Sequence, residues 1–468
     1  MNPDEARRPW SALILLSVAQ FMVVLDITVV NVALPSIGQD LAIAGADLQW
    51  VVTIYVLLSG GLLLLGGRLA DVLARRAVFL TGLLLFTSAS LVSGLAESGG
   101  TLIAARAAQG IGAALLTPAA LSIVTSYYTG GQRAKALGAW SAIGSAGAAV
   151  GVVLGGVLTT WLSWEWIFLI NVPIGLTAAA LASRVLPAAP AAAAARALDL
   201  PGALLVVSGL VVLVYAIDGA PEEGWGSAQT LVLVALALAL LGAFARVEAV
   251  SRRPLVPPAI WRVRSLVGSS AVLLGVTGIL VGTFFLNSLY LQGVSGASAL
   301  ETGLGFLPLA LAIGIGAHLS SAVMPRTGSR ALVAAGLALT AAGALVLAAA
   351  PDRASYAADI LPGLLVLGFG TGLVFPGVSV TAMSQVEPHQ VGLAAGVLST
   401  AHEVGAALGL AVIAAVASIG AAATDASLAA GYQDGFIAAA GIALVLAAAA
   451  VAVVPSVRPE AGAQAMAH

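Results

Sequence analysis

Four ionisable side chains lie inside long apolar stretches of this sequence: Asp26, Arg106, His402 and Glu403. A charged side chain at the centre of a membrane-spanning helix costs about 2.5–3.5 kcal/mol on insertion scales. Such a group is therefore expected only where it has a charge partner or a function. Carboxylates and imidazoles exchange protons, and a guanidinium holds a carboxylate. These residue types therefore predict proton transfer or ion pairing within the bilayer.

Asp26 and Arg106 are expected to lie at similar depth. Asp26 precedes Pro35 by nine positions, and Arg106 lies five positions after the start of its own apolar stretch at 101. With a rise of about 1.5 Å per residue, both fall in the outer half of the bilayer. We expect them to face one another across a cavity, where burial and the guanidinium act in opposite senses on the proton affinity of the carboxylate. A permanent structural ion pair is the alternative.

His402 and Glu403 lie in the apolar stretch 391–418, closer to its predicted inner end than to its outer end. Glu403 is a candidate second proton site or a contact for cationic substrates. A carboxylate that reaches the inner membrane surface is an equal alternative, and the sequence leaves both open.

The composition predicts a membrane protein. Of the 468 residues, 60% are hydrophobic and 9% are charged, against about 25% charged in a soluble domain. Lipid cannot satisfy free backbone groups, so helices are the expected spanning elements. The net charge of −2 gives no basis for nucleic-acid binding. The sequence has no cysteine, which excludes disulfides and cysteine-ligated metals, and it has no phosphate-binding loop for ATP.

We predict an all-α integral membrane protein with 14 transmembrane helices, because about 20 apolar residues cross the hydrocarbon layer. The expected helices cover residues 11–34, 49–67, 77–95, 101–123, 135–159, 164–184, 200–218, 229–247, 266–290, 302–323, 331–350, 357–379, 391–418 and 435–454. The first is longer than the roughly 7–15 apolar residues of a signal peptide and contains Asp26 and Asn31, so we expect it to be retained.

Basic residues gather in every second predicted loop, and acidic residues gather in the others. The loops assigned to the cytoplasm, together with the tail, hold Arg68, Arg75, Arg76, Arg133, Lys135, Arg184, Arg196, Arg246, Arg252, Arg253, Arg262, Arg264, Arg326, Arg330 and Arg458. Only Arg353 lies in a loop assigned to the outside. The positive-inside rule then predicts a multi-pass protein of a bacterial cytoplasmic membrane with both termini in the cytoplasm.

The sequence contains an internal repeat. A shift of 258 positions pairs Gly110, Gly112, Pro118, Gln132, Gly138, Gly147 and Gly151 with Gly368, Gly370, Pro376, Gln390, Gly396, Gly405 and Gly409. We therefore predict two pseudo-symmetric six-helix bundles with a two-helix insertion. The predicted boundaries are 1–186 for the first bundle, 187–264 for the linker and inserted helices, 265–456 for the second bundle and 457–468 for a cytoplasmic tail. Repeated membrane halves favour a transporter whose central site opens alternately to either side, and duplication without transport is the alternative.

Five glycines crowd the predicted helix 135–159, at Gly138, Gly147, Gly151, Gly155 and Gly156. Small residues four apart let two helices pack closely, which is the simplest interpretation. A smooth seam of this kind would also suit sliding or sealing between the two halves.

Several motifs together resemble one known family. They are the segment 25–35 (LDITVVNVALP), the segment 67–71 (GRLAD) followed by Arg75 and Arg76, the residues Leu102, Arg106, Gln109, Gly110 and Gly112, the glycines of 135–159, and the residues Trp164, Trp166, Phe168, Asn171, Pro173 and Gly175. Through Pro455 the chain resembles the major facilitator superfamily, specifically its fourteen-helix drug:proton antiporter branch of EmrB/QacA type. The segment 25–35 is the most specific of these motifs.

The residues and the resemblance together imply roles for individual positions. The proton-coupling residues are Asp26, Arg106 and Glu403; the substrate cavity holds Asp26, Asn31, Arg106, Gln109, His402 and Glu403; and the inner gate holds Gly67, Arg68, Asp71, Arg75 and Arg76. The five glycines of 135–159 correspond to the antiporter motif. The chain departs from the family pattern at Ala74, Val152, Glu165 and the pair His402–Glu403, where glycine, proline, arginine and Arg-Gln are usual.

We predict a transporter and not an enzyme: proton-coupled export of small lipophilic or cationic drugs and antibiotics by alternating access, with the proton as coupling ion and no cofactor. The expected partners are the small-molecule substrate and the lipid bilayer, and one chain is expected to work as a monomer. The alternative on the same fold is a dedicated exporter of one endogenous metabolite or self-made antibiotic. A membrane-embedded enzyme or a sensor is the remote alternative, since the four histidines are scattered and the predicted loops are too short for a sensor domain.

Overall fold

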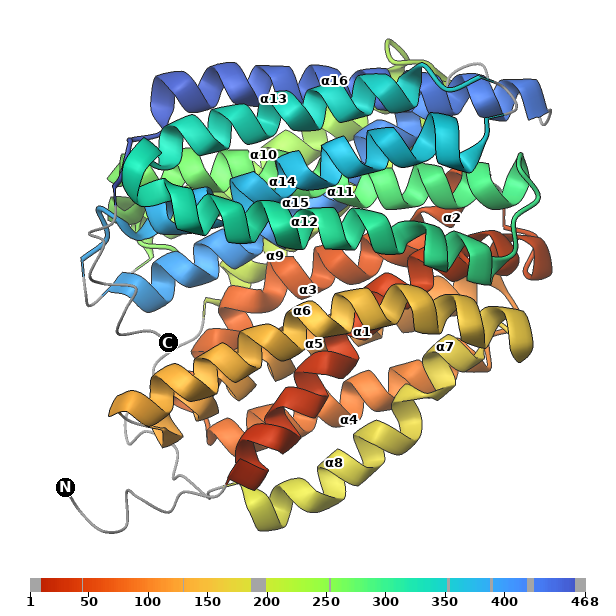
Figure 1. Cartoon of the computed structure of the whole chain (residues 1–468). Helices are drawn as coiled ribbons and strands as arrows, with labels where there is room; N and C mark the ends of the chain where they lie inside the picture. The colour runs from red at the N-terminus through yellow and green to blue at the C-terminus, as the bar shows by residue number, and fades with distance from the viewer. Residues whose placement is uncertain are drawn as a thin grey trace.

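The computed structural model describes residues 10–43, 45–128, 130–186, 199–251, 254–351, 354–387, 390–418 and 425–458. Every regular element in these ranges is a helix. The long helices run roughly side by side and form one bundle, with the described connections gathered at its two opposite ends (Figure 1).

The first six predicted spans form the first group of helices. Their bounds are α1 (Trp10–Asp40), α3 (Trp50–Val72), α4 (Arg75–Gly94), α5 (Gly99–Tyr127), α6 (Gly130–Trp161) and the consecutive pair α7 (Trp166–Leu169) and α8 (Asn171–Val185), with the single turn α2 (Gly45–Leu48) before α3.

The remaining spans form the insertion and the second group. Their bounds are α9 (Leu200–Glu223), α10 (Ala228–Val250), the short 3-10 turn η2 (Pro258–Arg262), α11 (Arg264–Gly293), α12 (Ala299–Thr327), α13 (Ser329–Ala348), the turn η3 (Tyr356–Ile360), α14 (Leu361–Met383), α15 (Val391–Ser418) and α16 (Asp425–Val453).

The predicted fold class is confirmed. Thirteen helical stretches among the described residues are long and apolar enough to cross a membrane, and α6 contains a further apolar stretch, Val150–Trp161. These stretches coincide in order with the fourteen predicted spans. The three boundaries between the four predicted segments stay predictions; residues 187–198 of the predicted linker and 459–468 of the predicted tail lie outside the described residues.

Several helices extend beyond their predicted ends, and the first and the last are examples. The first continues through Pro35 to Asp40, because proline's fixed φ is compatible with a helix and only one backbone hydrogen bond is lost. The last is already helical at Asp425, ten residues before the predicted start. Its polar residues there have tertiary partners: the Tyr432 hydroxyl donates to Asn287 Oδ1 at 3.1 Å, and Gln433 Nε2 donates to a backbone carbonyl at 2.8 Å.

The residues of the internal repeat have equivalent packing roles in the two groups. In the first group, a Cβ added at Gly112 of α5 would lie 2.7 Å from the backbone of Phe86 in α4. In the second group, a Cβ added at Gly370 of α14 would lie 2.6 Å from the backbone of Gly336 in α13. Glycine is needed at both places because two helix backbones approach closely.

The two groups of helices are joined at the predicted outer end of the bundle. Ser288 Oγ of α11 donates to the carbonyl of Asn31 at 2.6 Å, and Gln292 Nε2 donates to that of Val32 at 2.8 Å. The backbone N–H of Leu300 in α12 donates to Thr160 Oγ1 of α6 at 3.1 Å. These bonds hold the outer ends of the two halves together in this conformation.

The inserted helices are fastened to α3 near both ends of the bundle. At the predicted outer end, Asp218 of α9 accepts hydrogen bonds from Gln49 and, at 2.6 Å, from Trp50 Nε1. At the predicted inner end, Arg68 Nη2 of α3 donates to the carbonyl of Pro254, which follows α10, at 3.2 Å. The apolar face of α9 also packs against both α3 and α15.

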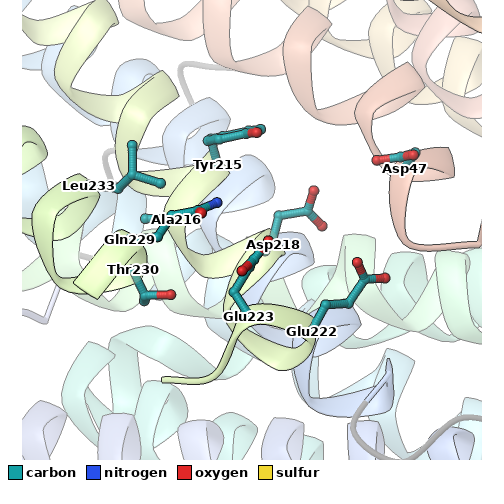
Figure 2. A pocket seen from close by; sticks show the side chains of 10 residues that line it. Asp47, Tyr215, Ala216, Asp218, Glu222, Glu223, Gln229, Thr230 and Leu233 are labelled. Atoms are coloured by element: carbon teal, nitrogen blue, oxygen red, sulfur yellow. The ribbon is translucent and has the colours of Figure 1, made fainter. Parts of the chain in front are cut away.

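A pocket of about 250 Å³ lies at the predicted outer end of the inserted pair. Its acidic lining residues are Asp218, Glu222 and Glu223 of α9, and Asp47 of α2 lies across from them (Figure 2). Asp47 of α2 is far from the three acids of α9 in the sequence, and the structure brings all four together around one hollow.

Candidate functional site

Asp26 of α1 and Arg106 of α5 form an ion pair in the interior of the first helix group. The contact joins Arg106 Nη1 to Asp26 Oδ2, and both side chains are 0% exposed. The structure thus brings together the two residues that were expected to meet at one depth. A charge pair buried this completely is costly unless further hydrogen bonds satisfy most of its remaining polar atoms.

Gln109 of α5 connects this pair to α4. Its Nε2 donates to Asp26 Oδ1 at 3.1 Å and to Ser90 Oγ at 2.7 Å. Its Oε1 accepts from Arg106 Nη1 at 3.0 Å and from Ser93 Oγ at 3.1 Å. Arg106 and Gln109 lie three residues apart and so share one face of the helix. Both N–H groups of the Gln109 amide therefore donate and its oxygen accepts twice, which fixes the orientation of the side chain.

Asn171 completes the shell around the carboxylate. Its Nδ2 donates to Asp26 Oδ1 at 3.1 Å, from the first residue of α8. Asp26 therefore accepts from Arg106, Gln109 and Asn171, all fully buried. In the sequence, Asn171 is recognisable only as part of a family motif, and no sequence pattern indicates Ser90 or the tyrosine described next.

Arg106 is held by more than its carboxylate partner. Its Nε donates to the carbonyl of Val51 at 2.9 Å. Its Cζ lies 4.2 Å from the ring centroid of Tyr55 and 5.5 Å from that of Phe168. Stacking of a guanidinium on aromatic faces is favourable and more so when water is absent. Close approach of α5 to α3 makes these contacts possible: a Cβ at Gly110 would lie 2.6 Å from the carbonyl oxygen of Tyr55.

Glu403 and His402 form a second, separate polar site on α15. Glu403 Oε2 accepts from Ser59 Oγ of α3 at 3.4 Å, and Glu403 Oε1 lies 3.7 Å from His402 Nδ1. Gly60 of α3 leaves the space that the Glu403 side chain needs. The Glu403 side chain is 19% exposed and that of His402 is 44% exposed, so this site is more open than the Asp26 site.

Asn31 lies apart from both polar sites in its contacts. Its Nδ2 donates to the carbonyl of Ile27 at 2.9 Å within α1, and its own carbonyl accepts the bond from Ser288 described above. The predicted cavity residues are therefore divided among the Asp26 cluster, the Glu403 site and the outer contact between the halves.

The predicted inner-gate residues lie at the ends of α3 and α4. Arg68 binds the segment after α10, as described, and Arg76 Nη1 donates to the carbonyl of Leu186 at 3.4 Å. Gly67 faces Pro118 of α5, and Arg75 begins α4. Asp71 is helical, but its side chain lies outside the described residues, so its pairing with the arginines stays a prediction.

The glycines of α6 face two different helices. A Cβ at Gly147 or Gly155 would press on α1, at 3.3 Å from Phe21 and 2.9 Å from Val29, and Gly151 contacts Thr28 of α1. A Cβ at Gly156 would lie 2.7 Å from the carbonyl oxygen of Ala299 in α12, across the junction between the halves. Gly138 also belongs to α6, and its surroundings lie outside the described residues.

Within the described ranges, His, Asp and Glu side chains form no group of three or more that could hold a metal ion. The side chains of the two polar sites can form ion pairs and hydrogen bonds, and their carboxylates can exchange protons.

Comparisons with known proteins place these features in a family context. Residues 16–410 match the Major Facilitator Superfamily. The puromycin resistance protein pur8 of Streptomyces alboniger is 43% identical over 424 residues, which cover 89% of this chain and 83% of that protein. The cephamycin export protein CmcT of Amycolatopsis lactamdurans is 41% identical over 414 residues, which cover 88% of this chain and 85% of that protein.

Solved structures share the fold at much lower identity. A crystal structure of the peptide transporter POT in complex with sulfate superimposes with a TM-score of 0.69 at 16% identity, over 94% of both chains. At that identity the likeness concerns the arrangement of helices alone.

Proposed function

This chain belongs to the Major Facilitator Superfamily, and from that premise we propose that it exports small lipophilic or cationic compounds, antibiotics among them, in exchange for protons by alternating access. The observation that carries the proposal is the buried Asp26 carboxylate, which accepts three hydrogen bonds and pairs with a buried arginine. The chain is a multi-pass membrane protein, and both termini are proposed to lie in the bacterial cytoplasm.

Proton binding at Asp26 changes what its neighbours can do. A neutral carboxyl no longer balances the charge of Arg106, and charge-assisted bonds are about twice as strong as neutral ones. The carboxyl oxygen that takes the proton becomes a donor, while Gln109 and Asn171 both present donors to Asp26 in this structure. The cluster must therefore rearrange when the proton arrives, and α1 shifts relative to α5 and α8.

The same helix carries the carboxylate and the outer contact between the halves. Asn31 and Val32, whose carbonyls bind α11, lie one to two turns beyond Asp26 on α1. With Asp26 charged, the outer ends stay joined and substrate enters from the cytoplasm or inner leaflet. Protonation from outside accompanies outward opening, and substrate leaves on that side. Each proton supplies about 2.3 kcal/mol per 100 mV, enough for roughly a fiftyfold substrate gradient.

The inner gate is proposed to close in the other half of the cycle. Arg68 and Arg76 bind backbone carbonyls here, and each keeps further donors for a carboxylate. Asp71 would pair with the arginines Arg68, Arg75 and Arg76 when the inner ends come together.

A dedicated exporter of one endogenous compound is the second candidate. The two relatives named above each carry the name of a single antibiotic, puromycin or cephamycin. The Asp26 cluster supports both candidate functions equally, because its proposed role is to bind the coupling proton in either case. The difference between them lies in how many compounds are exported.

Retention of labelled compounds in an antibiotic-sensitive bacterium tests the function directly. Cells with and without the chain would be loaded with puromycin, cephamycin, ethidium and tetraphenylphosphonium, each with and without a protonophore. We expect lower retention of at least one compound, and loss of that difference with the protonophore. A single responding antibiotic favours the dedicated exporter, and equal retention of every compound in both strains contradicts export.

A further inference from the structure

Tyr55 is a fully buried tyrosine that the sequence analysis did not single out. Its side chain is 0% exposed, and its hydroxyl has no hydrogen-bond partner among the described residues. A buried hydroxyl without a partner loses its hydration and gains nothing in return. Packing of the ring does not account for this hydroxyl, because its burial without a partner costs free energy.

The ring of Tyr55 belongs to the Asp26 cluster. The Arg106 guanidinium lies over it, with Cζ 4.2 Å from the ring centroid. Nη2 of that guanidinium is likewise buried and has no partner among the described residues. Two unpartnered polar groups, one on Tyr55 and one on Arg106, thus occur on stacked side chains. Such groups are the usual partners of buried water.

The same face of α3 also reaches the second polar site. Ser59 lies four residues after Tyr55, so the two side chains lie one above the other on the helix. Ser59 Oγ donates to Glu403 Oε2 at 3.4 Å. Tyr55 thus contacts the Asp26 site through Arg106 and lies one helical turn from the residue that binds Glu403.

We propose that Tyr55 is a positioning residue that couples Glu403 to the Asp26–Arg106 pair. Its ring holds the guanidinium at Asp26, and its hydroxyl joins, through water, the hydrogen bonds of Arg106 to those of Ser59 and Glu403. Loss of charge at either carboxylate then changes the hydrogen bonding at the other. The inference rests on the proposed proton-coupled export, and it adds a connection between two sites that would otherwise act independently.

The test measures protons released per molecule of substrate exported, in everted vesicles supplied with puromycin or tetraphenylphosphonium. Tyr55→Phe removes only the hydroxyl and keeps the stacked ring. We expect this ratio to fall about fivefold while substrate binding stays within about twofold of wild type, because only the connection is lost. Ser59→Ala breaks the same connection without touching the ring, and it should lower the ratio too. Tyr215→Phe, on an exposed tyrosine of α9, is the matched control and should leave the ratio unchanged.

A double variant separates coupling from local packing. If Tyr55 acts through Glu403, Tyr55→Phe should lower the ratio no further in a Glu403→Gln background, because interacting residues are non-additive. A ratio equal to wild type in both Tyr55→Phe and Ser59→Ala overturns the inference, as does a double variant whose loss is the product of the single losses. Wild-type vesicles that release no protons with any compound overturn the proposed function itself.

Discussion

The Asp26 carboxylate on α1 is held by three buried donors on two other helices, Arg106 and Gln109 of α5 and Asn171 of α8. The pair with Arg106 was expected because two opposite charges in apolar helices at one depth have few other ways to be stabilised. Asn171 and Ser90 were not assigned to the cluster, because a small polar side chain near a helix end costs little and leaves no pattern in the sequence. Tyr55 was not predicted for a related reason. An aromatic residue in an apolar helix is normally interpreted as a packing residue.

Arg106→Lys is predicted to reduce export about tenfold or more, even though the charge is kept. A lysine cannot reproduce together the bonds to Val51 and Gln109 and the stacking on Tyr55. Loss of one hydrogen bond to a charged group costs about 1.5–3 kcal/mol, and 1.4 kcal/mol is a factor of ten. Initial export rates in whole cells, normalised to the amount of protein in the membrane, measure this effect.

Arg184→Lys is the control for that substitution, because Arg184 is exposed in the last turn of α8. Its export rate should equal that of wild type. An Arg106→Lys variant with wild-type rates would show that only the positive charge matters at this position.

At the scale of elements, hydropathy predicted the number and order of the helices, since the thickness of the bilayer fixes how many apolar residues each needs. Which helices pack against one another was harder to predict from the sequence. The repeat indicated which glycines correspond, but the partner of each glycine depends on tertiary contacts. Gly112 and Gly156, for example, meet α4 and α12, and nothing in the spacing alone distinguishes these neighbours.

Gly112→Ala is predicted to destabilise the first helix group by about 1–3 kcal/mol, the usual cost of overpacking. The added methyl group would lie 2.7 Å from the Phe86 backbone, which has no flexible side-chain end to move. Gly100→Ala in the same helix meets nothing within 4 Å and should not destabilise. Thermal unfolding of the detergent-solubilised variants compares the two, and equal midpoints would contradict the packing described for α5.

The inserted pair α9–α10 is predicted to move with α3. Its bonds from Gln49 and Trp50 to Asp218, and from Arg68 to Pro254, tie it to α3 near both ends of the bundle. The chain has no cysteine, so native thiols cannot interfere with engineered cysteine pairs. A disulfide between Gly61→Cys and Val207→Cys, which links α3 to α9, should leave export intact.

A disulfide across the two halves provides the contrast. Thr160→Cys with Leu300→Cys links α6 to α12 where the native residues are joined by a hydrogen bond, and it should block export until it is reduced. Export that survives the second disulfide, or that is lost with the first, would contradict the assignment of moving parts.

At the scale of the whole molecule, the outer ends of the halves are joined while Asp26 is paired, and both features lie on α1. This arrangement is the physical basis for linking proton binding to alternating access. The fold class followed from the sequence, because apolar length, charge alternation and the repeat all restrict the same architecture. The conformation of the bundle and the attachment of the inserted helices could not be predicted from the sequence. Both depend on a few hydrogen bonds between distant segments.

Proton release from everted membrane vesicles, on addition of puromycin or tetraphenylphosphonium, tests the central claim most directly when wild type and Asp26→Asn are compared. Asparagine keeps the size of the side chain but cannot bind or release the proton. We predict that at least one compound collapses the imposed pH gradient in wild-type vesicles and leaves it unchanged in the variant. A variant that collapses the gradient as wild type does would contradict a coupling role for Asp26 and make its pair with Arg106 structural.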